Sequence, residues 1–166
     1  MELYLVRHAQ ALDIGEPGVT RDEARPLSPK GEADARRQGE ALRALGVVPT
    51  HLLTSPLLRA RQTAELLGGN HGAWRAHPFA PLAVGGDPDL VLARIAAAPA
   101  REALVLVGHE PQLGELFQAV LSGPGHPAIP LGKATIVCLE LDHARHEVKL
   151  RWVLAPKLTK AFLHLG

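Results

Sequence analysis

The sequence predicts an α/β fold: a three-layer α/β/α sandwich with a mostly parallel central sheet and a β-hairpin near the C-terminus. Short apolar runs at 2–6, 50–54 and 103–108 alternate with segments of helical periodicity, which predicts strands and covering helices. Two neighbouring segments, 135–141 and 148–154, alternate with period 2 and predict the hairpin. In such sheets ligands bind beyond the carboxyl ends of the strands, so that edge is where a site is expected.

Composition limits the class of protein further. The 166 residues suit one domain over 1–166, and 46% hydrophobic residues are enough for a buried core. A net charge of +1 gives no general attraction to nucleic acid or to an acidic membrane. The lone Cys138 excludes an internal disulfide and fits a reducing compartment, and the chain begins with no secretory signal pattern. We therefore expect a cytoplasmic protein.

The first helix follows a polar, turn-rich segment at 11–27. Ser28-Pro29 supplies an N-cap and a proline at the first helical position, and Gly46 ends the helix. The helical spacing predicts three inward-facing side chains, Ala35, Leu42 and Leu45.

The remaining elements follow from the same signals. Ser55-Pro56 repeats the cap-and-proline pair and predicts a helix that ends at Gly68-Gly69. Residues 70–87 are expected to be irregular, apart from a short strand near 75–79. Further helices are predicted from about Pro88 to Ala98 and from Pro111 onward.

Polar side chains follow three of the predicted strands. The first strand ends in Arg7-His8, and the third ends in His109. The second ends in Ser55, with Arg59 on the following helical turn, where a side chain leans back toward the strand end. If the strands are parallel, two histidines and two arginines meet at one edge, close to helix N-termini. The fork geometry of the arginine side chains favours an anion with at least two oxygens, a phosphate or a carboxylate.

Other sites for these residues are less well supported. None of the nine histidines shows HExxH, HxH or Cys/His ligand spacing, so neither a metal nor another cofactor is expected. A nucleotide P-loop and a G-x-S-x-G elbow are also missing from the sequence. Each residue has an ordinary structural explanation: Ser55 as a helix cap, Arg59 paired with a helical acid such as Glu65, and each histidine hydrogen-bonded at a strand end. One phosphate site explains them together.

These motifs resemble those of the histidine phosphatase superfamily, whose members have a phosphoglycerate mutase-like fold. LVRHAQA (5–11) is similar to the Arg-His-Gly signature, TSPLLRARQTA (54–64) to the second arginine motif and LVLVGHEPQLGEL (104–116) to the second histidine motif. RPLSPKGEADA (25–35) is similar to the segment after the first loop. The small size, Ala9 in place of glycine and the VGHEP run look most like the SixA-type phosphohistidine phosphatase branch.

The resemblance implies a role for each matched residue. His8 becomes the nucleophile that is transiently phosphorylated, Arg7 and Arg59 the phosphate clamps, and His109 a donor to the transferring group. Arg25 corresponds to an additional arginine beside the substrate in the SixA branch.

A general acid is harder to assign. Asp87 lies in the expected part of the chain, but it is equally suited to cap the helix at Pro88. Glu110 adjoins His109 at a helix N-terminus. With Ser55, these two acids complete the candidate substrate contacts. A nitrogen leaving group is more easily protonated than an alkoxide, so a missing acid favours a phosphoramidate substrate. Gln10 stands where the SixA branch often carries an acidic residue.

Three functions are therefore considered. The first is a phosphohistidine phosphatase whose partner is a phosphorylated protein of the histidine-phosphotransfer type. The second is a phosphatase of a small phosphorylated metabolite. The third is a phosphate- or phosphoprotein-binding module without turnover. No nucleic-acid or membrane partner is expected, and the sequence leaves the oligomeric state open, a monomer being compatible with it.

Overall fold

The computed structural model describes residues 1–69, 74–123 and 125–163 and confirms the α/β sandwich. Its central sheet has six strands in the order β3-β2-β4-β1-β5-β6. The strands β1, β2, β3 and β4 run parallel, whereas β5 is antiparallel to β1 and β6 is antiparallel to β5. Their bounds are β1 Glu2–Arg7, β2 His51–Thr54, β3 Ala76–Pro78, β4 Ala103–Gly108, β5 Ile136–Asp142 and β6 Glu147–Leu154.

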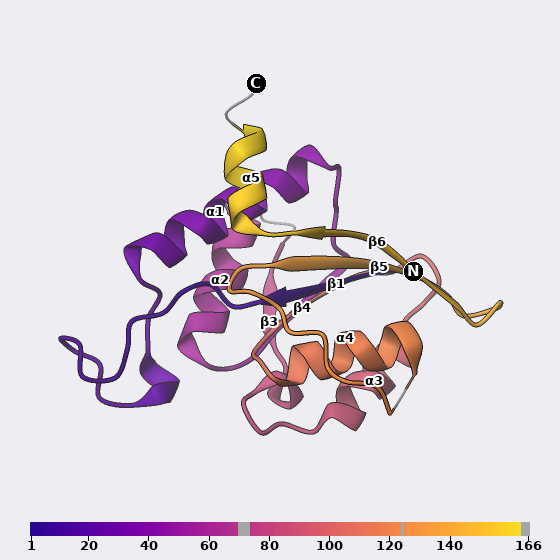
Figure 1. The fold of residues 1–166 in the computed structure, drawn as a ribbon, viewed down its shortest axis with the longest axis horizontal. Helices are drawn as coiled ribbons and strands as arrows, with labels where there is room; N and C mark the ends of the chain where they lie inside the picture. Colours follow the sequence, from indigo (N-terminus) through magenta and orange to yellow (C-terminus); the bar gives the residue numbers. More distant parts are fainter. Residues whose placement is uncertain (70–73, 124, 164–166) are drawn as a thin grey trace.

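Helices cover both faces of the sheet (Figure 1). On one face lie α1 (Pro29–Ala44), α2 (Leu58–Gly68) and α5 (Pro156–Leu163). On the other lie α3 (Pro88–Ala96) and α4 (Gln112–Ser122). Two short 3₁₀ helices, η1 (Asp22–Ala24) and η2 (Ala80–Leu82), interrupt the loops. The helix α5 was not predicted. None of the described helices is both long and apolar enough to cross a membrane.

The strands β1 and β4 form the centre of the core, because both of their faces are covered. Leu3 and Leu5 of β1 pack toward α3 and α4, whereas Tyr4 and Val6 pack toward α1 and α2. The same strands end in Arg7 and Gly108, so the residues that follow are held by a buried framework.

The structure differs from the predicted helices in two details. The helix α2 begins at Leu58 with Leu57 as its N-cap residue, not at Ser55-Pro56. The Ser55 hydroxyl accepts a hydrogen bond from Leu57 N at 3.3 Å, so it closes a turn before the helix instead of capping it. Leu45 was expected to face inward, but 57% of its surface is exposed, because α1 ends at Ala44 and the chain turns away there. Of the segment predicted to be irregular, residues 70–73 lie outside the described part.

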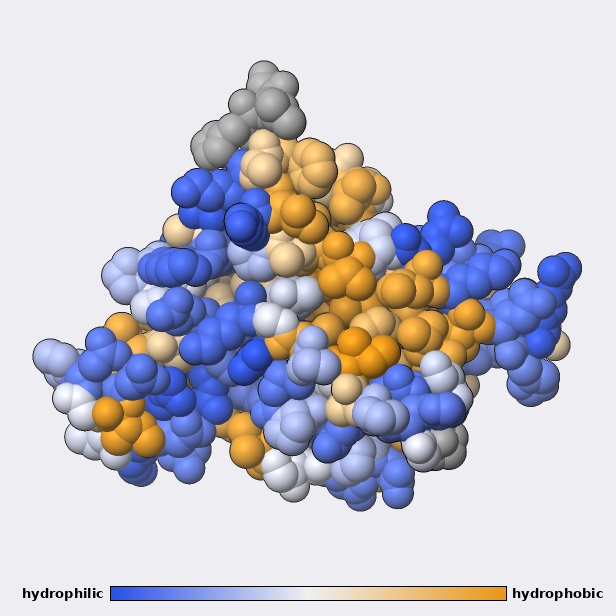
Figure 2. Space-filling model, viewed as in Figure 1, coloured by the Kyte–Doolittle hydropathy of each residue, from blue (hydrophilic) through white to orange (hydrophobic). Residues whose placement is uncertain are grey.

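The hairpin is confirmed, and its two strands differ in burial. β5 lies between β1 and β6, and most of its side chains are buried on both faces. β6 is an edge strand, and a register shift at Cys138/Leu139 interrupts its pairing. Exposed hydrophobic side chains lie along β6 and α5, where Figure 2 shows a broad apolar area; they include Leu150, Val153, Leu158 and Phe162.

Candidate active site

The segment after β1 is held from several sides. The His8 N–H donates to the Gly108 carbonyl at 3.0 Å, which ties it to the end of β4. The Ala134 N–H donates to the Arg7 carbonyl at 3.1 Å, and the Ala9 N–H donates to the Thr63 hydroxyl at 3.0 Å. Parallel pairing of β1 with β4 thus brings the two strand ends together, as the sequence predicted.

A glycine on α1 lets this segment approach the helix closely. Gly31 lies in the first turn of α1, directly against the backbone of Gln10. A Cβ at position 31 would overlap the Gln10 carbonyl oxygen. The same carbonyl accepts a hydrogen bond from Ser28 N at 2.9 Å, so α1 supports the chain beyond His8.

His8 is buried and neutral. Its Nδ1 lies 2.7 Å from the Ala9 carbonyl oxygen. Since a carbonyl oxygen only accepts, Nδ1 carries the proton and Nε2 keeps its lone pair. Burial lowers the pKa of His8 to about 4; the hydrogen bond to Ala9 opposes this, and the charges of Arg59 and Arg7 add to it. The ring is therefore uncharged at neutral pH, with its single proton on Nδ1.

His109 lies beside His8, with the two ring centroids 4.9 Å apart. Its Nε2 is hydrogen-bonded to the Ser55 hydroxyl at 2.8 Å. Burial, the His8 ring and the Arg59 charge lower the pKa of His109 to about 3. The structure thus brings together four of the predicted residues, His8, His109, Ser55 and Arg59.

The two arginines approach the histidines from different elements. Arg7 at the end of β1 donates through Nη1 to the Leu131 carbonyl at 2.6 Å. Arg59 in the first turn of α2 is 4% exposed, and its charge acts on both His8 and His109. Within the described part of the chain, the Nε atoms of both arginines and Nδ1 of His109 are buried without a hydrogen-bond partner. Buried donors in this number are what an anion site requires.

Sequence analysis missed Asp22, which contacts Arg59. The side chain of Asp22 on η1 accepts from Arg59 Nη2 at 3.0 Å, and its main-chain oxygen accepts from Nη1 at 2.8 Å. Arg59 therefore pairs with this acid and not with Glu65. Arg25 is bound to the same carboxylate at 3.2 Å and to Asp13 at 2.7 Å. Arg25 thus reaches the site through Asp22.

The two predicted acids lie in different environments. Asp87 caps α3, its carboxylate accepting from Asp89 N at 2.9 Å, which matches the structural alternative considered for it. Glu110 is partly buried, and its Oε1 has no hydrogen-bond partner among the described residues. Burial raises the pKa of Glu110, against the opposing effects of hydrogen bonds from the backbone and the charge of Arg7.

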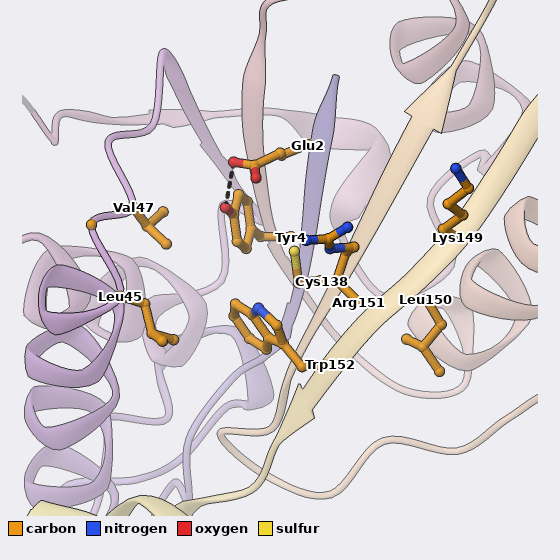
Figure 3. Close-up of a pocket in the computed structure, with 10 residues that line it drawn as sticks. Glu2, Tyr4, Leu45, Val47, Cys138, Lys149, Leu150, Arg151 and Trp152 are labelled. Atoms are coloured by element: carbon orange, nitrogen blue, oxygen red, sulfur yellow. Dashed lines mark hydrogen bonds between the residues drawn. The ribbon is translucent and has the colours of Figure 1, made fainter.

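A separate cavity of about 670 Å³ opens on the α1 side of the sheet, between the C-terminal end of α1 and β1, β5 and β6 (Figure 3). Tyr4 and Trp152 form its aromatic wall, with ring centroids 5.9 Å apart. Its charged groups are already paired, as in the hydrogen bond from Tyr4 to Glu2 and the ion pair of Arg151 with Glu140. The cavity contains neither histidine of the strand-end site.

Metal ligands were not expected at this site. Across residues 1–69, 74–123 and 125–163, His, Cys, Asp and Glu side chains form no group of three that could hold a metal ion. The two histidines are flanked by Arg7 and Arg59, which favour an anion at that place.

Comparison of the sequence with known proteins identifies the family of this chain. The sequence profile of the histidine phosphatase superfamily (branch 1) matches residues 3–80. A protein of Picosynechococcus sp. described as uncharacterized is 41% identical over 148 residues, which are 87% of this chain and 88% of that protein. The chain belongs to the histidine phosphatase superfamily.

Solved structures indicate which branch of this superfamily the chain resembles. The protein histidine phosphatase SixA, complexed with tungstate, superposes with a TM-score of 0.82 and 26% identity, covering 95% of this chain and 99% of that one. The structure is therefore of the SixA type. The α-ribazole phosphatase from Shigella flexneri superposes with a TM-score of 0.75 and 16% identity, over 94% of this chain and 97% of that one, which shows a shared fold.

Proposed function

We propose that this protein is a metal-independent phosphatase that removes phosphate from phosphohistidine in a signalling protein. The covalent intermediate is His8 phosphorylated on its own ring. The observation that carries the proposal is the pair of neutral rings, His8 and His109, whose centroids lie 4.9 Å apart beside Arg7 and Arg59. The similarity to SixA complexed with tungstate supports the same reading of the site.

The reaction proceeds in two displacements. Nε2 of His8 attacks phosphorus; the Nε2–P bond forms while the bond from phosphorus to the substrate nitrogen breaks. The electron pair stays on the leaving imidazole, which takes up a proton. Water then attacks the phosphorylated His8, loses a proton and releases phosphate, and the electron pair of the broken Nε2–P bond returns to the ring.

The donors without a partner stabilise the negative charge of the transferring phosphoryl group. The Nε–H groups of Arg7 and Arg59 are buried and unbonded among the described residues, so they are available to the equatorial phosphoryl oxygens. Nδ1 of His109 joins them as a neutral N–H donor while Ser55 occupies Nε2. These groups supply positive potential without a metal ion.

The ionised Asp22 beside Arg59 favours a nitrogen leaving group. Partial burial raises the pKa of Asp22, but hydrogen bonds from Arg25 and Arg59 outweigh this and lower it below its usual value. Asp22 is therefore ionised at neutral pH and holds no proton to give. An imidazole leaving group accepts its proton readily, so it depends least on such an acid.

A second candidate function, hydrolysis of a small phosphomonoester, is favoured by Glu110. Burial raises the pKa of Glu110 above its usual value, so this carboxyl holds a proton more readily than an exposed one, as an acid for an alkoxide leaving group must. The shared fold of the α-ribazole phosphatase supports this candidate.

The deciding experiment compares phosphate release from a phosphohistidine protein and from a phosphomonoester, with EDTA present. We expect faster turnover of phosphohistidine, abolished by His8→Ala and unaffected by EDTA. The matched control is His143→Ala, because His143 is an exposed histidine in the β5–β6 turn.

Each other outcome contradicts the proposal in a different way. Faster ester turnover that Glu110→Gln removes would favour the small-molecule phosphatase. Turnover retained by His8→Ala would exclude the phosphorylated His8. Phosphate binding without turnover of either substrate would leave a binding module.

A further inference from the structure

Asp22 places a negative charge directly on Arg59, one of the two arginines proposed to hold the phosphoryl group. Both terminal nitrogens of Arg59 are engaged by Asp22, Nη2 by the carboxylate at 3.0 Å and Nη1 by the main-chain oxygen at 2.8 Å. The Arg59 side chain is 5% exposed and that of Asp22 is 42% exposed. The acid therefore covers this buried guanidinium on its solvent side.

This contact has an electrostatic consequence for any anion in the site. A guanidinium binds phosphate best through two parallel N–H bonds. A carboxylate on the same guanidinium neutralises part of its charge and competes for its N–H groups. The pKa of Asp22 is lowered by Arg25 and Arg59, so this competing charge is present throughout the neutral range.

The carboxylate also extends its effect to the neighbouring groups. It binds Arg25 at 3.2 Å, and Arg25 is anchored by its Nε to the Leu12 carbonyl at 2.6 Å. It also acts on His109, where its charge opposes the lowering of the pKa by Arg59. Asp22 thus reduces the positive potential at three groups, Arg59, Arg25 and His109.

We propose that Asp22 is a specificity-determining residue, an internal anionic ligand of Arg59 that weakens the binding of free inorganic phosphate. This inference rests on the proposed function, in which phosphate is the product. A phosphoryl group attached to a larger substrate gains binding energy from the rest of that substrate, whereas inorganic phosphate has only the site itself. The carboxylate therefore selects against the free anion and promotes its release.

The test is direct binding of orthophosphate, measured by calorimetry on the folded protein without substrate. Asp22→Asn keeps the size of the side chain and one acceptor oxygen and removes the charge; the amide nitrogen that replaces the other oxygen can only donate, so one of the two arginine contacts is lost. We expect Asp22→Asn to lower the Kd for orthophosphate about tenfold, a value typical of removing one close, partly screened like charge. The gain should shrink as salt is raised, since the carboxylate is partly exposed.

Asp13→Asn is the matched control. Asp13 also pairs with Arg25, at 2.7 Å, but its side chain is 85% exposed, and among the described residues it forms an ion pair with Arg25 alone. The control should leave the Kd close to that of the unmodified protein. Equal tightening by both variants would show a general charge effect and overturn the proposal, as would an unchanged or weaker affinity in Asp22→Asn.

The binding measurement separates this inference from the proposed function. If Asp22→Asn tightens orthophosphate binding in a protein that hydrolyses neither substrate, the electrostatic role of Asp22 is supported and the phosphatase assignment fails. If phosphohistidine is hydrolysed but the Kd is unchanged by Asp22→Asn, the assignment is supported and the role of Asp22 fails.

Discussion

The hydroxyl of Ser55 lies between the backbone and His109, and this fixes what the ring can do. Ser55 Oγ accepts from Leu57 N at 3.3 Å and lies 2.8 Å from His109 Nε2. When the hydroxyl donates to Nε2, the neutral ring carries its proton on Nδ1, the nitrogen without a partner in the described structure. This arrangement leaves the Nδ1–H of an uncharged His109 free to donate, as the proposed mechanism requires.

Ser55→Ala should therefore lower kcat about fivefold with little change in KM, because one hydrogen bond worth about 1 kcal/mol that orients the donor is lost. Steady-state turnover of phosphohistidine measures both constants. Ser55→Thr keeps the hydroxyl and should restore most of the rate. If the threonine variant is as slow as the alanine variant, the side chain acts through packing and not through its hydrogen bond.

At the scale of elements, the helix α1 packs against the segment that carries His8 at its N-terminal end and against α2 further along. Gly31 lies against the Gln10 carbonyl near the site, and Gly39 lies against the Leu67 carbonyl of α2. The two glycines are eight residues apart, about 12 Å along the helix. Both positions require the close approach of two backbones, but only the first lies beneath the segment that carries His8.

Gly31→Ala and Gly39→Ala should both destabilise the protein, by about 1–3 kcal/mol, because an added methyl group forces the packed backbones apart. Only Gly31→Ala should also reduce kcat, since it displaces the chain next to His8. Urea unfolding measures the first effect and turnover at saturating substrate the second. Equal loss of turnover in both variants would mean that the site responds to global stability alone.

The elements that sequence reasoning predicted well have local signals. Ser28-Pro29 opens α1, with the Ser28 hydroxyl accepting from Gly31 N at 3.1 Å, and the apolar run at 103–108 forms β4 as predicted. The same signal misled at Ser55-Pro56, because the Ser55 hydroxyl is taken up by His109 and by a turn that precedes α2. Tertiary contacts there outweigh the local preference.

The residues of the site that follow a strand could be predicted from the sequence, whereas the residue that lies in a loop could not. Arg7, His8 and His109 follow from the rule for parallel strand ends. Asp22 reaches Arg59 from 37 residues away, through a polar loop whose path no periodicity reveals. Leu45 likewise became exposed because the helix ended one residue before it.

At the scale of the whole molecule, two buried neutral histidines make stability depend on pH. The pKa of His8 falls to about 4 in the folded protein, below the usual value of 6.5, so the unfolded chain binds more protons between these values. The free energy of unfolding should therefore rise with pH from about 4 to 6.5 and gain nothing more from this residue above that range. His8 alone accounts for about 2 kcal/mol between pH 5 and 7.5.

Urea unfolding at pH 5 and 7.5 tests this dependence. His8→Gln should reduce the difference between the two values, whereas His143→Gln, at an exposed position, should leave it as in the unmodified protein. A difference of the same size in His8→Gln would mean that the ring is not held neutral by the fold.

The pairing of β1 also fixes the order in which the site is completed during synthesis. β1 emerges first, but its partner strands are β4, beginning with Glu2 opposite Ala103, and β5, with Val6 opposite Ile136. Contacts of such long sequence separation form late, after the entropy of closing the intervening chain has been overcome. A growing chain that lacks β4 therefore has nowhere to dock the strand that carries Arg7. The proposed phosphate site is then a property of the nearly complete polypeptide, and shortened translation products should carry the LVRHAQA motif without the activity proposed for it.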